Sequence, residues 1–361
     1  MNFKSLKKQI TDRLTNNSFI IMSKLVKFSK SYIDILNIKK DFYENNKINL
    51  VNSLKINKIY KKQPLRKFCK NCGSKKIKPF ICSFNIIYKL CSNCGHLNGA
   101  YEDTNNFANK LYNQDDGKNY SSNYLNDYNE RVKKIYIPKV KFLKEVIKEK
   151  IKVLDIGSGA GHFIKALESR NIAGIGYETS KELCYLGNKN LKRNKISQVN
   201  LGEIYDLPNK EKFANTLSLI HVLEHLVEPH KLLKSFVNSK IKYLYIAVPL
   251  FSLTTFIENS FPKVFPRQLS GGHTHLYTKK SLIFLAKKYN LKIIGEYWFG
   301  TDFPDLMRSL INSGNIINQK IYSQELKNKF SNLIDELQFV LDKNKICSEV
   351  HMVFEREKYK K

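Results

Sequence analysis

The 361-residue sequence predicts an α/β fold, in which helices cross over between the strands of a sheet. Three observations support this fold class. Apolar runs of strand length alternate with stretches of helical spacing over residues 150–354, a glycine-rich turn follows the first run, and an acidic residue ends the second. Such alternation is typical of a largely parallel sheet with crossover helices.

The first apolar run, Val153–Ile156, leads into a turn with Gly157, Gly159 and Gly161 at alternate positions. Glycine accepts positive φ and lets the backbone approach a ligand, and the helix that follows presents N–H groups to an anionic group. The glycines follow Asp155 as G-x-G-x-G, which differs from the G-x-G-x-x-G dinucleotide fingerprint. We therefore expect a nucleotide-like cofactor at this turn.

The second apolar run, Ile172–Tyr177, ends in Glu178, about 20 residues beyond the glycine turn. A carboxylate at this place can accept hydrogen bonds from both hydroxyls of a ribose. The alternative is that Glu178 is only a solvated acid at a strand end.

A third signal is the apolar run 215–220 with the string HVLEHLVEP at 221–229, which we interpret as a strand end leading into a helix start. Ligands of open parallel sheets bind outside the carboxyl ends of the strands. We therefore expect His221, Glu224 and His225 to lie near the reacting group.

Further strands are expected at 241–248, 291–297 and 347–354, with a helical insertion over 305–344. The apolar positions of this insertion recur at helical spacing. It is either a lid or a dimer surface, or a helical decoration without a direct role.

These motifs together resemble class I S-adenosylmethionine-dependent methyltransferases, over roughly residues 140–354. The resemblance implies a Rossmann-like, doubly wound, seven-stranded mixed sheet whose last strand is antiparallel. It also implies that S-adenosylmethionine is the cofactor. The residues it assigns to cofactor binding are Asp155, Gly157, Gly159, Gly161, Glu178, Glu203 and His221.

Within that set, the glycines would line the methionine portion, Asp155 would lie near its amino group, and Glu178 would hold the ribose. Glu203 follows the expected third strand, where members of the family contact adenine. Ile204 is the alternative, as a residue that packs on the ring.

Two C-x2-C pairs, Cys69/Cys72 and Cys91/Cys94, predict a small zinc ribbon. Four thiolates close a tetrahedral structural site with no open position for catalysis, and the glycine after each pair suits the tight turn. Disulfides are the alternative, but they fit badly with a chain that shows no export signal.

The chain divides into four parts: a basic N-terminal extension (1–66), the zinc ribbon (67–100), a linker and substrate-side segment (101–139) and the methyltransferase core (140–361). A helix is expected from about residue 131 to 148. No apolar run is long enough to span a bilayer and there is no secretory h-region, so we expect a cytoplasmic location.

The formal net charge of +30 permits an anionic partner. Lysine is abundant together with Asn, Ile, Tyr and Phe, whose codons are rich in A and T, and the lysines are spread through the whole chain. Nucleic-acid binding is therefore possible but not favoured.

A narrower resemblance comes from combining the ribbon, the Glu224–His225 pair and the string GGHTHLYTKKSL at 271–282. This combination is similar to bacterial enzymes that methylate sugars or other small hydroxylated metabolites. We therefore expect a small-molecule acceptor such as a saccharide or a nucleotide sugar. Sugar C-methyltransferases usually have a further C-terminal domain after the core, which counts against C-methylation here.

Methyl transfer to a hydroxyl needs a positioned acceptor and a base. His225 is the first candidate for the base, and Glu224 would bind the hydroxyl or orient the imidazole. His273, on a glycine-led loop, is the third catalytic candidate, with His275 as its neighbour. Two alternatives stay open: His225 only packs or caps, or two histidines and Glu224 bind a divalent ion.

Two other functions remain possible. Some ribosomal RNA methyltransferases also join a cysteine ribbon to this core, but the sequence lacks an N/D-P-P-Y/F string after the fourth strand and a cysteine after the fifth. A non-catalytic binding protein would have little need for the glycine turn and Glu178.

Overall fold

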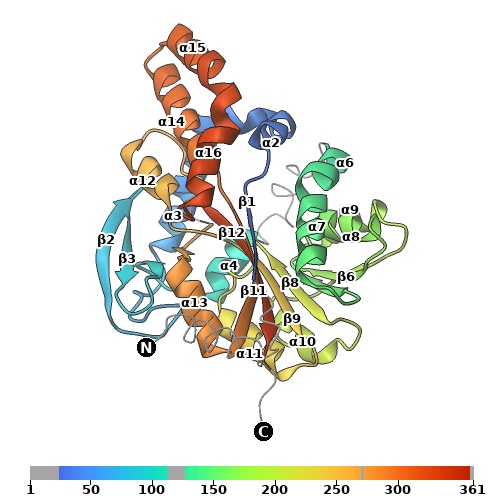
Figure 1. Ribbon diagram of the computed structural model, residues 1–361. Helices are drawn as coiled ribbons and strands as arrows, with labels where there is room; N and C mark the ends of the chain where they lie inside the picture. Colours follow the sequence, from blue (N-terminus) through green and yellow to red (C-terminus); the bar gives the residue numbers. More distant parts are fainter. Residues whose placement is uncertain (1–23, 113–126, 270–271, 358–361) are drawn as a thin grey trace, which may run out of the picture.

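The computed structural model describes residues 24–112, 127–269 and 272–357. Its centre is an eight-stranded sheet with the order β1-β11-β12-β9-β8-β5-β6-β7 (Figure 1). Seven of these strands belong to the predicted core: β5 (Lys152–Ile156), β6 (Ala173–Glu178), β7 (Ile196–Gln198), β8 (Thr216–Ile220), β9 (Tyr243–Pro249), β11 (Leu291–Phe299) and β12 (Glu349–Arg356).

Strand β12 runs antiparallel to both of its neighbours, β9 and β11. The pairs β5–β6, β5–β8, β6–β7 and β8–β9 are parallel. The mixed sheet with an antiparallel last strand is therefore confirmed.

All seven predicted core strands are present, and the N-terminal extension adds an eighth strand, β1 (Leu25–Phe28), which was not predicted. This strand pairs in parallel with β11, with Leu25 opposite Gly295. The extension continues into α2 (Tyr32–Ile38), η1 (Lys40–Tyr43) and α3 (Asn46–Tyr60). A four-residue strand between lysines has too short a pattern to stand out in the sequence.

Helices cover both faces of the sheet (Figure 1). One apolar core lies between the sheet and α7 (Ile137–Val146), α8 (His162–Glu168) and α9 (Lys181–Lys189). A second core lies on the other face, against η3 (Glu203–Tyr205), α10 (Leu207–Lys210), α11 (Pro229–Asn238) and α13 (Lys279–Lys288). Burying both faces of a parallel sheet in this way is the general solution for α/β folds.

The expected helix near residues 131–148 consists of three joined pieces: α6 (Tyr128–Arg131), a π-helical turn η2 (Val132–Tyr136) and α7. The expected helical insertion is formed by α14 (Asp302–Ile316), α15 (Lys320–Phe330), η4 (Ser331–Leu333) and α16 (Ile334–Lys343). In Figure 1 these orange and red helices stand together at one end of the sheet. The Ser31 hydroxyl donates to Asp335 Oδ2 (3.0 Å), which ties α16 to the start of α2.

The cysteine-containing region forms a second, four-stranded sheet with the order β10-β4-β3-β2. Its strands are β2 (Ile77–Ser83), β3 (Ile86–Cys91), β4 (Leu97–Gly99) and β10 (His275–Leu276). Strand β10 comes from the core, from the loop that also contains His273, and pairs antiparallel with β4. The ribbon is therefore docked on the core by a shared strand pair.

Two short helices complete the described part: α4 (Asn105–Tyr112) after the ribbon and α12 (Leu253–Ser260) after β9. Within residues 24–112, 127–269 and 272–357, no helix is both long enough and apolar enough to cross a bilayer.

Candidate active site

The glycine turn has the backbone conformation that its sequence predicts. Gly157, Gly159 and Gly161 have φ values of 72°, 52° and 75°. The Gly157 and Ser158 N–H groups both donate to Tyr177 O, at 2.8 and 3.1 Å, which ties the turn to β6. A Cβ on Gly157 would lie 2.4 Å from Val222 Cγ2, whereas a Cβ on Gly159 would meet nothing within 4 Å. Gly159 therefore borders open space, as a ligand-binding turn requires.

Glu178 lies at the end of β6, directly beside this turn. Its Oε2 accepts the Gly159 N–H at 2.8 Å, and its Oε1 accepts the N–H groups of Thr179 (2.8 Å) and Ser180 (3.0 Å). The side chain is therefore held in one orientation at the turn. The alternative of a merely solvated acid does not match a residue that is only 9% exposed.

Asp155 is buried at the end of β5 and accepts a hydrogen bond from the Ser218 hydroxyl on β8 at 2.5 Å. Burial raises the pKa of Asp155 to about 7. A cationic group that approached this carboxyl would therefore favour its ionised form.

An aromatic cover over the glycine turn was missed by sequence reasoning. The Tyr128 hydroxyl donates to Ala160 O at 3.2 Å, and its ring stacks on His162 with a centroid distance of 4.2 Å. Tyr136 stacks on His162 at 5.2 Å. Both tyrosines precede β5 in sequence: Tyr128 begins α6, and Tyr136 ends the π-helical turn η2.

The string at 221–228 does not begin a helix, which corrects the sequence interpretation. These residues form turns, and α11 begins at Pro229, because proline suits the first turn of a helix. His221 has a left-handed backbone (φ 55°), and its N–H donates to Ala247 O at 2.9 Å.

The His221 imidazole contacts two carboxylates. Its Nε2 lies 3.1 Å from Glu349 Oε1, and its Nδ1 lies 3.4 Å from Glu224 Oε1. Burial opposes the imidazolium charge, but Glu349 and Glu224 outweigh it and raise the pKa of His221 to about 9. His221 is therefore a cation at neutral pH.

Glu349 and His351 on β12 were not singled out from the sequence. The His351 Nε2–H donates to Glu349 Oε1 at 2.9 Å, and its Nδ1 accepts the Tyr245 hydroxyl at 2.5 Å. Burial lowers the pKa of His351 to about 3, so this imidazole is neutral. The strand alternation could have placed both residues on one face, but nothing local links them to residue 221.

Glu224, His225 and His273, the three catalytic candidates named from the sequence, lie together in the structure. Their ligand atoms all lie within 4.8 Å of one another, and the two imidazole rings are 5.0 Å apart between centroids. His225 Nε2 lies 3.9 Å from Glu224 Oε1, and the His273 Nδ1–H donates to Gln268 O at 2.8 Å. Burial lowers the pKa of His225, and lowers that of His273 to about 4.

Glu224 itself is 1% exposed. Burial opposes its charge, but the neighbouring histidines, His221 first, hold the pKa of its carboxyl below the usual value. Its carboxylate lines a small cavity together with His225 and Thr274 from the core, and with Asp103 and Phe107 from the segment after the ribbon. One side of this cavity is thus formed by residues of the segment that follows the ribbon.

The other predicted histidine and the adenine candidates lie apart from this cluster. His275 is buried in β10 and its Nδ1 lies 2.9 Å from His96 Nε2, so it contributes to ribbon docking. Glu203 is exposed, and its Oε2 accepts the Asn200 N–H at 2.9 Å. Ile204 is buried in the apolar core.

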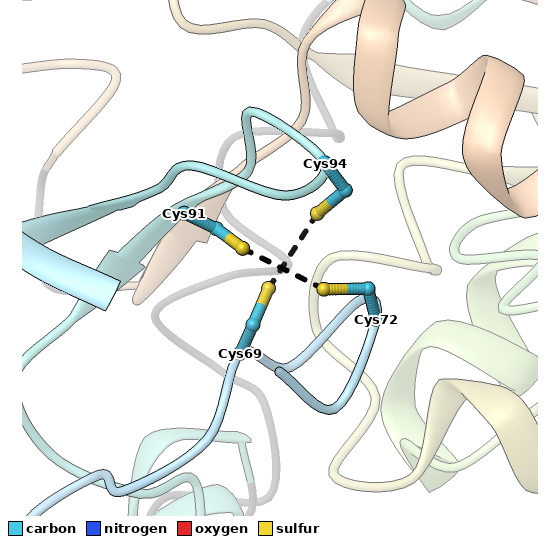
Figure 2. Close-up of side chains that lie close together, drawn as sticks. All are labelled: Cys69, Cys72, Cys91 and Cys94. Atoms are coloured by element: carbon cyan, nitrogen blue, oxygen red, sulfur yellow. Dashed lines mark hydrogen bonds between the residues drawn. The ribbon is translucent and has the colours of Figure 1, made fainter. Parts of the chain in front are cut away.

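The four ribbon cysteines converge on one point (Figure 2). Cys69 Sγ lies 3.6 Å from Cys94 Sγ, and Cys72 Sγ lies 3.5 Å from Cys91 Sγ. These separations are far longer than a disulfide bond, and close to the roughly 3.8 Å edge of a tetrahedron with metal–sulfur bonds of about 2.3 Å. Gly73 and Gly95, both with φ 72°, close the two knuckle turns.

The strand order, the glycine turn and the acid at the end of β6 match the fold that the resemblance to class I methyltransferases implies. Residues 128–296 match the family model described as "Methyltransferase domain". The matched segment is therefore a methyltransferase domain, as the sequence analysis predicted. No curated protein matches it at a significant level.

Similar solved structures include an S-adenosylmethionine-dependent methyltransferase from Archaeoglobus fulgidus, with 18% identity over 61% of this chain and 92% of that chain (TM-score 0.39). Magnesium protoporphyrin IX methyltransferase from Synechocystis PCC 6803 has 10% identity over 70% and 100% (TM-score 0.45). Geranyl diphosphate C-methyltransferase from Streptomyces coelicolor A3(2) has 12% identity over 61% and 77% (TM-score 0.40).

Proposed function

We propose that this enzyme methylates a small hydroxylated acceptor, a saccharide or a related biosynthetic intermediate, with S-adenosylmethionine bound at the carboxyl ends of β5 and β6. The single observation that supports the cofactor position best is the open space at Gly159 beside the fixed carboxylate of Glu178. When bound, the cofactor supplies an electrophilic methyl group on a sulfonium.

On the cofactor side, each residue has a distinct role. Glu178 accepts hydrogen bonds from the ribose hydroxyls, and the positive-φ backbone of Gly159 lets the methionine portion come close. Asp155 binds the amino group, which draws its carboxyl into the ionised form. Glu203 is exposed near the end of β7, within the region where adenine would lie.

The acceptor side is formed by Glu224, His225 and His273, beyond the end of β8. Neutral imidazoles and a buried carboxylate are suited to bind an acceptor hydroxyl and to assist the loss of its proton. The cationic His221 contacts Glu224, and the next residue, Val222, packs on Gly157 of the glycine turn. We assign it to the cofactor side, where it orients Glu224.

We also propose that the ribbon cysteines hold one structural zinc ion, with Cys69, Cys72, Cys91 and Cys94 as ligands. The ribbon then has a clear structural task. Through the β4–β10 pairing and the His96–His275 contact, it fixes the loop that contains His273. Asn71 Nδ2 also donates to Ser281 O on α13 at 3.0 Å.

The acceptor class can be tested with labelled S-adenosylmethionine and two acceptor pools: small metabolites including nucleotide sugars, and total RNA. We expect label in the metabolite pool, and expect Glu178→Ala to abolish it while the matched variant Glu182→Ala retains it. Label in RNA alone would show that the acceptor is RNA, which the net charge of +30 permits, and would contradict the proposed small-molecule acceptor.

A further inference from the structure

We propose that Glu224, His225 and His273 form a second metal site, which binds a divalent transition-metal cation. A group of two histidines and one carboxylate is a common ligand set for such cations and leaves coordination positions open. The site would hold its ion without any cysteine ligand. Its use in catalysis, though not its existence, rests on the proposed function.

The orientation of the imidazoles supports this proposal. Metal-bound histidines almost always donate their second N–H to a carbonyl or carboxylate, which fixes the tautomer. His273 does so through Nδ1 to Gln268 O at 2.8 Å, which leaves the lone pair of Nε2 for an ion. His225 makes a backbone hydrogen bond with Gly272, while its Nε2 lies on the side of Glu224.

The carboxylate supplies a second, independent observation. Neither oxygen of Glu224 accepts a hydrogen bond within the described residues, although the side chain is fully buried. Burying a carboxylate without hydrogen bonds or a cation is costly, and native proteins compensate such groups. His221 Nδ1 at 3.4 Å and His225 Nε2 at 3.9 Å compensate only in part. A cation within the cluster would complete the compensation.

The neighbouring group of His221, Glu349 and His351 provides a contrast. It has the same residue types within the same range of distances. There, however, Glu349 Oε1 accepts hydrogen bonds from both histidines, and His351 Nδ1 accepts a hydrogen bond from the Tyr245 hydroxyl. Its ligand atoms already bond to one another, so the proposal concerns the Glu224 cluster alone.

The place of the cluster fits a role at the acceptor. Glu224 and His225 line the small cavity, which has room for about one ion or water molecule. An acceptor hydroxyl that coordinates the ion through oxygen loses its proton to solvent more easily. The oxygen lone pair then forms the new O–CH3 bond while the S–CH3 bond breaks. The electron pair of the broken S–CH3 bond stays on sulfur.

The test is a metal count on full-length protein that has been purified without chelator and equilibrated with Zn²⁺. We expect about two ions per chain in the wild type and about one in both Glu224→Gln and His273→Asn. The matched control is His230→Asn, because His230 contacts Tyr289 and Lys70 outside the cluster, and we expect it to keep two. Circular dichroism verifies that each variant is folded, and the second variant guards against misfolding of the first.

Replacing zinc with Co²⁺ separates the two sites. Cobalt in the ribbon gives thiolate-to-metal charge transfer, whereas cobalt at the Glu224 cluster gives only ligand-field bands, and these bands should disappear in the two variants. One ion per chain in the wild type, or cobalt spectra unchanged by Glu224→Gln, would overturn the proposal. Failure of the proposed function gives a different result: two ions per chain, with no label in hydroxylated metabolites.

Discussion

The Gly159 N–H donates a 2.8 Å hydrogen bond to Glu178 Oε2, and this bond joins the glycine turn after β5 to the acid at the end of β6. The turn and the acid are 19 residues apart in sequence. The same carboxylate accepts two more N–H groups from the start of the next segment. Glu178 therefore helps to determine the shape of the turn, and we propose that it also offers oxygens to a ribose.

Replacement of this acid should weaken cofactor binding strongly. For Glu178→Gln we expect S-adenosylhomocysteine affinity to fall by roughly 10- to 100-fold, because charge-assisted hydrogen bonds worth about 1.5–3 kcal/mol are lost. Isothermal titration calorimetry measures the change. Glu182→Gln, on α9 nearby, is the control; if both variants bind like the wild type, Glu178 does not hold the ribose.

A side chain at Gly159 should interfere with the ligand more than with folding. Gly159→Ala places a methyl group in the open space and imposes a left-handed conformation that costs roughly 1–2 kcal/mol. We expect a large loss of cofactor affinity with a modest fall in Tm. Gly202→Ala is the matched control, because a Cβ at Gly202 also meets nothing within 4 Å but the residue has an ordinary φ of −70°. Equal affinities in the two variants would contradict the cofactor position.

The raised pKa of Asp155 predicts a pH dependence of cofactor binding. The carboxyl has a pKa of about 7 in the protein alone, and the ammonium group of the cofactor favours its ionised form, so binding releases a proton. Affinity for S-adenosylhomocysteine should therefore rise by roughly tenfold between pH 6 and pH 8 and then level off. Asp155→Asn should remove this dependence; a variant that keeps the same slope would show that another group titrates.

Loss of a ribbon cysteine should destabilise the ribbon and its docking to the core. Because structural zinc contributes directly to folding, we expect Cys91→Ser to release one zinc ion and to lower Tm by on the order of 10 °C. Cys82→Ser is the control, since Cys82 is exposed and lies outside the cluster. Metal analysis measures the zinc content of both variants, and thermal unfolding measures their stability. An unchanged zinc content in Cys91→Ser would reject the tetrathiolate site.

Local patterns determined how much of the fold could be predicted. Six of the seven core strands stand out because they are continuous apolar runs, and the glycine turn is specified by conformations that few other residues adopt. The short β7 (Ile-Ser-Gln) has no such run, and only the family resemblance implied a strand there. Strand β1 was missed because its side chains are only partly buried. The expected helix at 221–228 was wrong because the apolar spacing of a short string does not distinguish a turn from a first helical turn.

Local sequence patterns also predicted part of the candidate site. Glu224 and His225 could be nominated because they follow a strand whose carboxyl end faces the ligand edge of the sheet, and His273 because it lies on a glycine-led loop. Glu349 lies 128 residues from His221, and only the position of β12 in the sheet brings the two together. Likewise, the stacking of Tyr128 on His162 depends on the path of the chain through η2, which has no sequence signature of its own.

Calorimetry of the full-length protein with S-adenosylhomocysteine tests the central claim most directly. The account predicts one binding site per chain, abolished or greatly weakened by Glu178→Ala and retained in Glu182→Ala. If well-folded wild-type protein bound neither S-adenosylmethionine nor S-adenosylhomocysteine, the assignment of the glycine turn and Glu178 as a cofactor site would be contradicted.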